Sequence, residues 1–118
     1  MIEEMYSNIV VWMNSNGYEE KTDSIISQIR ELHGLIEIYK AEFDASRTIT
    51  MAAIWVLEQN GILRDDIRKI LPSSSEIFDD SEIYKKEYDY LLKIINLKEE
   101  IINLERTYSS GNRGRKNK

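Results

Sequence analysis

The stretch Ala53–Phe78, AIWVLEQNGILRDDIRKILPSSSEIF, predicts a helix, a tight turn and a second helix. Apolar side chains recur in it at spacings of three and four residues, which is the period of an α-helix. Gly61 marks the turn, because glycine has no Cβ and readily adopts the left-handed conformation that ends many helices. We therefore expect helices at about 53–60 and 63–71. The open question is whether this corner reads DNA or only turns the chain.

The apolar spacing of this corner resembles that of a DNA-binding helix-turn-helix. The apolar positions of that motif are filled by Val56, Ile62, Ile67 and Ile70. Asn60, however, stands where a buried apolar residue is usual, and Leu57 stands where a small residue favours close helix approach. Asp65 and Asp66 fall at the start of the second helix, where a DNA reader would face phosphates.

Two interpretations of the corner follow, and the first is favoured. In the first, Asn60 and Gly61 cap the first helix, while Asp65 and Asp66 favour the positive N-terminal end of the second. In the second, segment 53–71 is a degenerate helix-turn-helix. The bases available for phosphate contact in that case are Arg64, Arg68 and Lys69.

The chain before this corner predicts two further helices. The first covers about 3–14 and ends at a left-handed cap on Asn16-Gly17. The second covers about 23–43 and is capped by Thr22 or Asp23. Its apolar side chains step by 4, 3, 4, 3 and 4 residues, as in a coiled-coil seam. They are Ile25, Ile29, Leu32, Ile36, Tyr39 and Phe43. Gly34 interrupts this seam, which suggests either a closely packed neighbour or a useful weak point.

The chain after the corner predicts one long helix. It begins at about Glu76, with Ser73 and Glu76 forming a capping box, and runs to Thr107. Alternatively, it begins at Ser81, which would then be its cap, with Phe78 as a hydrophobic staple. Its apolar seam repeats the steps of 4, 3, 4, 3 and 4, through Tyr90, Ile94, Leu97, Ile101, Leu104 and Tyr108.

Together these patterns predict an all-α fold, a helical bundle of about five helices with a long C-terminal coiled-coil-like helix. Residues 1–108 form a single all-α domain, and residues 109–118 form a disordered basic tail. The two long helices pack antiparallel within one chain, or they pair across a dimer axis. A homo-oligomer is therefore one expected assembly.

Charge is distributed unevenly along the 118 residues, whose formal net charge is −5. Residues 1–46 carry nine acids against three bases, and residues 76–110 carry nine against five. An acidic body repels nucleic acid over most of its surface, so contact with DNA would depend on the corner and on the basic tail. The tail offers Arg113, Arg115 and Lys116. Its Arg-Gly-Arg core resembles the centre of an AT-hook, although a solubilising tail is the favoured interpretation.

The sequence lacks the residues that most kinds of catalytic site require. The chain has no cysteine and one histidine, His33, which shares a helix face with Glu37. Nucleophilic triads, zinc sites and glycine-rich phosphate loops are absent from the sequence pattern. We expect no enzyme and no catalytic, cofactor-binding or metal site. No apolar run approaches the roughly 20 residues of a membrane span, and the N-terminus lacks a secretory signal. We therefore expect a cytoplasmic protein.

The tyrosines indicate where a partner protein would bind. Tyrosine combines a large apolar ring with a polar tip and is common at interfaces. The candidate partner-binding residues are Tyr84, Tyr88, Tyr90, Ile94, Leu97, Ile101 and Leu104. The sequence thus favours a helical protein–protein interaction module that acts as a regulator, adapter or inhibitor, and an origin in a mobile element is compatible with it. Its acidic face would suit mimicry of nucleic acid. The alternative function is a nucleic-acid-binding regulator that uses segment 53–71 and the tail.

Overall fold

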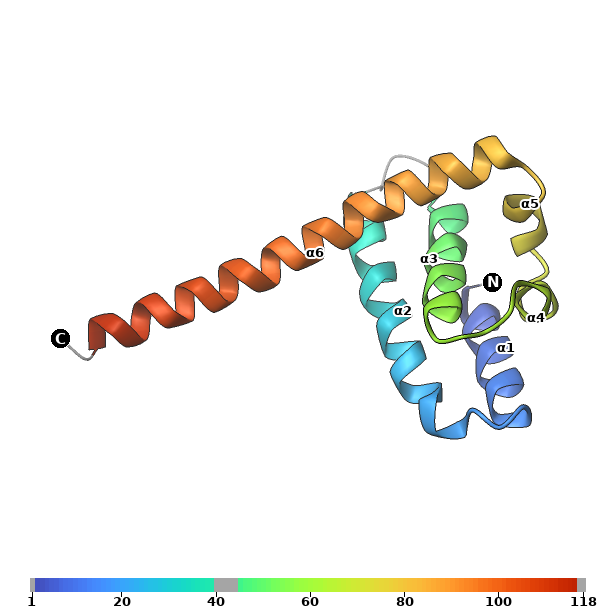
Figure 1. Cartoon of the computed structure of the whole chain (residues 1–118), viewed down its shortest axis with the longest axis horizontal. Helices are drawn as coiled ribbons and strands as arrows, with labels where there is room; N and C mark the ends of the chain where they lie inside the picture. The colour runs from blue at the N-terminus through green and yellow to red at the C-terminus, as the bar shows by residue number, and fades with distance from the viewer. Residues whose placement is uncertain (1, 40–44, 117–118) are drawn as a thin grey trace.

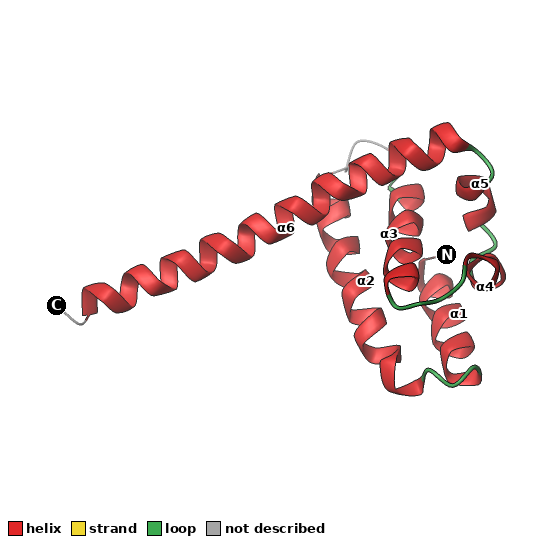
Figure 2. Ribbon diagram, in the orientation of Figure 1, coloured by secondary structure: helices red, strands yellow, loops and turns green. Residues whose placement is uncertain are grey.

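The computed structural model describes residues 2–39 and 45–116, with side chains described as far as Tyr108. Within these residues the chain forms helices and no strands, which confirms the predicted all-α class. The helices are α1 (Ile2–Ser15), α2 (Glu19–Tyr39), α3 (Ser46–Gln59), α4 (Arg64–Ile70), α5 (Ser74–Phe78) and α6 (Ser81–Lys116). The first five form a body, and α6 crosses one end of it and then projects away (Figure 1). Short loops join the shorter helices (Figure 2).

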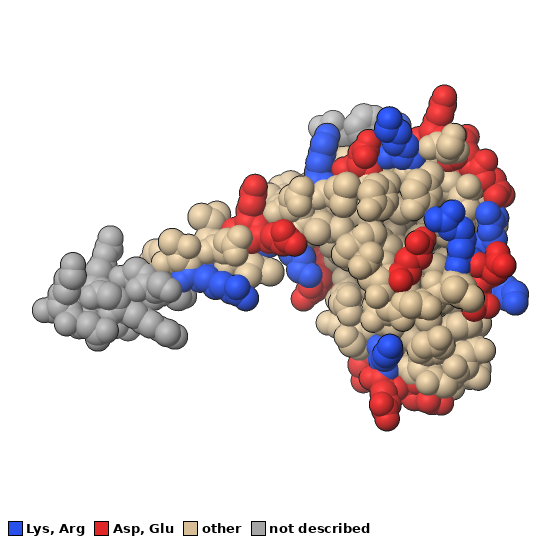
Figure 3. Space-filling view, in the orientation of Figure 1, with Lys and Arg blue, Asp and Glu red and all other residues tan. Residues whose placement is uncertain are grey.

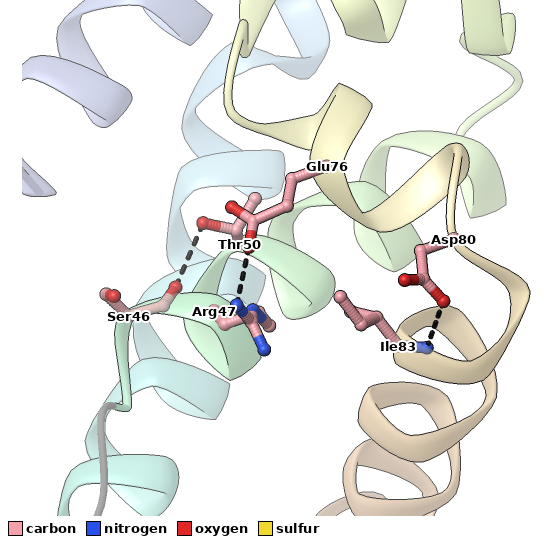
Figure 4. Close-up of polar contacts among 6 residues, drawn as sticks. All are labelled: Ser46, Arg47, Thr50, Glu76, Asp80 and Ile83. Atoms are coloured by element: carbon pink, nitrogen blue, oxygen red, sulfur yellow. Dashed lines mark hydrogen bonds and ion pairs between the residues drawn. The ribbon is translucent and has the colours of Figure 1, made fainter.

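Helix α3 is the centre of the body. Its buried residues lie on every side of the helix, as expected for a helix surrounded by others. They are Thr48, Ile49, Met51, Ala52, Ala53, Ile54, Val56 and Leu57. It contacts α2, α4, α5 and α6. It begins at Ser46, seven residues before the predicted start, and Thr50 donates its hydroxyl to the Ser46 carbonyl in the first turn (2.9 Å; Figure 4).

Helices α1 and α2 pack against each other, and α2 also packs against α3. The α2 seam is buried as predicted over its first four positions, Ile25, Ile29, Leu32 and Ile36. Tyr39, the fifth position, is 52% exposed, and Phe43 lies outside the described residues. The structure places no neighbouring atom within 4 Å of a Cβ built on Gly34, so the expectation of a closely packed neighbour at Gly34 is wrong.

The predicted N-cap of α2 is also wrong. The helix begins at Glu19, so Thr22 and Asp23 lie inside it. The Thr22 hydroxyl is instead buried between α1 and α2, 3.0 Å from the Asn14 Oδ1 to which it donates and 3.1 Å from the Tyr18 carbonyl.

Both predicted left-handed caps are confirmed. Gly17 and Gly61 have φ angles of 84° and 85°, which place them in the region that disfavours side chains. After α3, the Gly61 N–H donates to the Glu58 carbonyl and the Ile62 N–H donates to the Leu57 carbonyl, both at 3.0 Å. This pair of bonds is a Schellman motif, and Ile62 is buried as its apolar contact.

The start of the last helix differs from the predicted capping box. Ser73 makes no side-chain cap hydrogen bond, and the Glu76 carboxylate pairs with Arg47 of α3 (Figure 4). The short helix α5 is therefore separate from α6 and is tied to α3. A proline at 72 ends α4, because proline cannot supply the amide that helix continuation needs.

Helix α6 begins at Ser81, as the alternative prediction proposed, but its cap is Asp80. The Asp80 Oδ1 accepts hydrogen bonds from the backbone N–H groups of Glu82 (3.0 Å) and Ile83 (3.2 Å; Figure 4). A carboxylate suits this position because it satisfies free amides and faces the positive end of the helix dipole.

The first half of α6 packs on the body and the second half does not. Glu87, Leu91 and Ile94 are buried. Two contacts with α2 follow in antiparallel order: the Tyr90 hydroxyl donates to the Tyr39 carbonyl (3.0 Å), and Lys98 pairs with Glu31. These contacts lie where α6 crosses the end of α2, beyond which α6 leaves the body (Figure 1), so the two long helices do not pack antiparallel along their length as predicted. The α6 backbone continues to Lys116, beyond the predicted helix end at Thr107, while the side chains of the predicted tail, 109–118, lie outside the description.

Candidate functional site

One surface cluster combines residues from both sets of sequence candidates. It forms where the start of α4, the end of α5 and the first turns of α6 meet. We call it the arginine–aromatic surface and define it by Arg64, Arg68, Phe78, Tyr84 and Tyr88. The loop around Pro72 joins α4 to α5, which contact each other, and α6 begins after the Asp80 cap and packs across α3. Residues of α4 and α6 that are distant in sequence therefore become neighbours.

Three aromatic rings form a row on this surface. The ring centroids of Phe78 and Tyr84 are 6.4 Å apart with planes inclined by 27°, and those of Tyr84 and Tyr88 are 5.9 Å apart and inclined by 11°. Tyr84 and Tyr88 align because residues four apart lie on the same face of a helix. All three rings are partly exposed, so one side of the row is packed and the other is open to solvent.

Two guanidinium groups lie over this row. The Arg64 Cζ is 4.6 Å from the Phe78 ring centroid and 5.6 Å from that of Tyr84, while the Arg68 Cζ is 5.1 Å from the Phe78 centroid. These distances lie within the range in which an aromatic face attracts a cation. The stacking fixes the direction of side chains that would otherwise sample many rotamers.

Carboxylates compensate both arginines. Arg68 donates to the Asp79 carboxylate at 2.9 Å and to the Ser75 hydroxyl at 3.2 Å. The hydrogen bond to Asp79 holds the pKa of that carboxyl below its ordinary value and raises the pKa of Arg68 above its own. Arg64 lies 3.9 Å from the Glu58 Oε1, an atom that is buried without a hydrogen bond.

The electrostatic setting of Tyr84 reflects the same neighbours. Burial raises the pKa of its hydroxyl, and the negative charge of Glu58 raises it further, whereas Arg64 acts in the opposite direction. Tyr84 therefore stays neutral and able to donate a hydrogen bond at physiological pH. Acidic and basic side chains are interspersed over the end of the molecule that holds α4 and α5 (Figure 3).

The remaining sequence candidates are dispersed. Lys69 is exposed on α4 and pairs with Asp66 at 3.8 Å. Tyr90 bonds to α2 and Ile94 is buried, so both serve packing within the chain. On the projecting half of α6, Leu97 and Ile101 are partly exposed and Leu104 is 68% exposed. The side chains of the tail candidates Arg113, Arg115 and Lys116 lie outside the description.

A second polar group of side chains joins α1 to α2. The Tyr6 hydroxyl and the His33 Nδ1 share a hydrogen bond of 2.9 Å, and the His33 Nε2 lies 2.8 Å from the Glu37 Oε1. Burial raises the pKa of Tyr6, against the opposing effect of Arg30, whose Cζ lies 4.2 Å from its ring centroid. Since Tyr6 is itself in the core, we interpret this group as a helix contact that satisfies buried polar atoms.

A buried carboxylate was missed in the sequence. Glu87 is only 3% exposed and accepts a 2.6 Å hydrogen bond from the hydroxyl of Thr48, which is fully buried in α3. Its position holds the signal that could have found it, because Glu87 follows Tyr84 by three residues and precedes Leu91 by four. It therefore lies in the middle of the stripe by which α6 faces the body.

Within the described residues, no three carboxylate or histidine side chains gather so as to hold a metal ion. In the same part of the chain, no helix has both the length and the apolar character that a bilayer span requires. Comparisons of the chain with protein-family models, with curated protein sequences and with solved structures found no match.

Proposed function

We propose that this chain is a non-enzymatic interaction module that binds a partner protein through the arginine–aromatic surface, and so acts as a regulator, adapter or inhibitor. The observation that carries the proposal is the row of three stacked rings with two guanidinium groups over it. Tyrosine and arginine are the residue types enriched at the energetic centres of protein interfaces.

Order within this surface supports the proposal. Binding costs free energy for each flexible side chain that must be fixed, about 0.5–1.5 kcal/mol for long ones. Here Arg64 and Arg68 are already stacked, and Arg68 is also bonded to Asp79 and Ser75. A partner would therefore meet guanidinium groups that need little further ordering.

Charge compensation favours a protein over a polyanion. Nucleic-acid affinity depends mainly on uncompensated positive charge that can displace phosphate counterions. Glu58 and Asp79 lie against the two arginines, and Asp65 and Asp66 occupy the first turn of α4. These four carboxylates lower the positive potential where a helix-turn-helix would approach phosphates.

Nucleic-acid binding remains the second candidate for one specific reason. Aromatic rings beside arginines also form the stacking platforms on which single-stranded nucleic acids bind. Such binding would weaken steeply with added salt, whereas a compensated protein interface would respond less. Salt dependence therefore separates the two candidates.

The test is affinity purification of the tagged chain after nuclease treatment, followed by titration of whatever protein co-purifies in stoichiometric amount. Substitution Arg64→Ala or Tyr88→Ala is expected to weaken the complex about 30-fold, the effect of losing one central interface residue. Lys69→Ala is the matched control, because Lys69 lies on the same helix as Arg64 but is 74% exposed and outside the surface.

Two results would contradict the proposal. One is a partner complex that survives both Arg64→Ala and Tyr88→Ala unchanged. The other is recovery of nucleic acid alone, with an affinity that falls by orders of magnitude between low and physiological salt. Circular dichroism of each variant establishes that the helices are intact, so that loss of binding reports on the surface and not on unfolding.

A further inference from the structure

The projecting half of α6 exposes apolar side chains that no part of the described chain covers. Leu104 and Tyr108 are 68% and 74% exposed. Leu97 and Ile101 precede them on the same seam and are partly exposed. A row of large apolar groups on a free helix is the surface that a second helix covers in a coiled coil. The projection is evident in Figure 1.

We propose that this half of α6 pairs with the same half of a second copy of the chain, with the two helices antiparallel. The inference goes beyond the proposed function and uses a different surface, since the arginine–aromatic surface lies at the opposite end of α6. Its central layers set Ile101 of each copy against Leu104 of the other. Its outer layers set Leu97 of each copy against Tyr108 of the other.

The charged residues beside the seam favour an antiparallel over a parallel orientation of the two helices. In a heptad whose core positions are Leu97, Ile101, Leu104 and Tyr108, the flanking positions on one side hold Lys98 and Glu105, and those on the other hold Lys93 and Glu100. A parallel pair sets one flank against the opposite flank, so Lys93 meets Lys98 and Glu100 meets Glu105. Both contacts are repulsive in each half of such a pair.

An antiparallel pair sets like flanks together and removes this repulsion. Lys98 of each copy then faces Glu105 of the other, which gives two attractive contacts, and Glu100 faces the uncharged Thr107. Flanking charges of this kind set partner choice and helix orientation in coiled coils, while the apolar layers supply most of the affinity.

The same charged residues favour one register of the antiparallel pair. Moving the pair by one heptad toward the body would set Lys98 against Lys98 and Glu100 against Glu100. It would also require Ile94 and Tyr90 as core layers, although Ile94 is buried in its own chain and Tyr90 is bonded to α2. The register centred between Ile101 and Leu104 avoids these like-charge contacts, and its four apolar layers use neither Ile94 nor Tyr90.

The contact between Lys98 and Glu31 is compatible with this pairing. Glu31 lies on α2 and holds the Lys98 ammonium group beside the seam. An ammonium has three N–H donors, so it can bond to Glu31 of its own chain and to Glu105 of the second copy together. Each antiparallel contact then becomes a small network of one lysine and two carboxylates.

The first test is the solution mass measured by sedimentation. We expect twice the monomer mass of 13.9 kDa, and Leu104→Glu should weaken the dimer at least 30-fold by placing a charge in its central layers. Val11→Glu is the matched control, because Val11 is an apolar residue of similar exposure, 62%, on α1. A wild-type chain that stays monomeric at concentrations up to about 100 µM would overturn the proposal, because any dimer would then have a Kd above that concentration.

The second test determines orientation by charge reversal. Glu105→Lys should weaken an antiparallel dimer about tenfold, since Lys98 of the other copy would then face a second ammonium group. Combining it with Lys98→Glu should restore the wild-type affinity, because the two charges are exchanged and the attraction returns. A parallel dimer predicts the opposite sign for the single change, because Glu100 would then face the introduced lysine. A dimer that tightens with Glu105→Lys would therefore overturn the antiparallel pairing.

Cysteine pairing provides an independent readout, because the natural chain contains no cysteine. A mixture of Ile101→Cys chains and Leu104→Cys chains should form mixed disulfides on mild oxidation, whereas each variant alone should not. Self-linking of Ile101→Cys alone would indicate a parallel pair. Arg64→Ala should leave the dimer unchanged while it disrupts the proposed partner complex, so failure of one proposal can be told from failure of the other.

Discussion

Helices α2 and α6 carry the same apolar spacing but have different surroundings. In α2 the seam residues Ile25, Ile29, Leu32 and Ile36 are all buried in the core of their own chain. In α6 the same repeat passes from buried Ile94 to Leu104 and Tyr108, which are largely exposed. A heptad pattern therefore predicts which face of a helix will pack against another helix. It does not predict whether that helix belongs to the same chain.

Position in the chain explains the difference. Helix α2 packs against both α1 and α3, whereas α6 meets the body only along its first half. Because α6 runs to Lys116, it continues well past the ion pair of Lys98 with Glu31 of α2. The body thus packs on itself, whereas Leu104 and Tyr108 of the projecting half of α6 stay exposed among the described residues.

The largest expected contrast comes from shortening one side chain in each region. Ile54→Ala in α3 should lower the free energy of unfolding by about 2–5 kcal/mol, because the removed methyl groups leave a cavity in a fully buried site. Leu104→Ala should change the unfolding of the monomer by no more than about 0.5 kcal/mol. Urea denaturation at a dilution that favours monomer measures both, and equal losses would contradict the proposed division of the molecule.

A smaller effect is expected where α6 is fastened to the body. Thr48→Val keeps the side-chain shape but removes the hydroxyl that donates to the buried Glu87 carboxylate. Losing a hydrogen bond to a charged group should cost about 1.5–3 kcal/mol of stability. Thr50→Val is the control, since the Thr50 hydroxyl bonds within α3 in the first turn and is partly exposed. A cost for Thr50→Val as large as that for Thr48→Val would show that the carboxylate contact is not the reason.

Two glycines of the body should give effects of opposite sign. Gly34→Ala should stabilise the chain by about 1 kcal/mol, because Gly34 lies inside α2 with open space around a new Cβ. Gly61→Ala should destabilise it by about 1–2 kcal/mol, because its φ of 85° strains any residue with a side chain. Thermal unfolding of the pair distinguishes helix propensity from turn geometry, and a stabilised Gly61→Ala variant would contradict the assigned cap.

Some helix ends could be predicted from the sequence because they depend on local chemistry, whereas others could not. Gly17 and Gly61 identified their helix ends, because glycine's conformational freedom is a local property. The start of α3 at Ser46 was missed, because Thr48, Ile49 and Thr50 are β-branched and weak helix formers, and burial overrides that preference. Helix type was thus predictable where local chemistry and packing agree.

The candidate site was predictable only in its parts. Arg64 and Arg68 were identified as bases for nucleic acid, and Tyr84 and Tyr88 as aromatics for a partner, on separate grounds. Their meeting depends on the direction in which the loop around Pro72 and the Asp80 cap send α6, which is a tertiary property. The compensating role of Asp79 follows from the same geometry and could not be read from spacing alone.

The smallest expected effect concerns that compensating pair at the surface. Because the Arg68 hydrogen bond lowers the pKa of Asp79 in the folded chain, the pair stabilises the fold above the carboxylate's unfolded pKa. This stabilisation is lost as the pH falls through the lower, folded pKa. Titration of Asp79 by NMR should give a midpoint below the ordinary 3.8, and Arg68→Ala should return it toward that value. Since Asp79 is exposed, the change in overall stability should be slight, and the same midpoint in both proteins would show that the bond does not persist in solution.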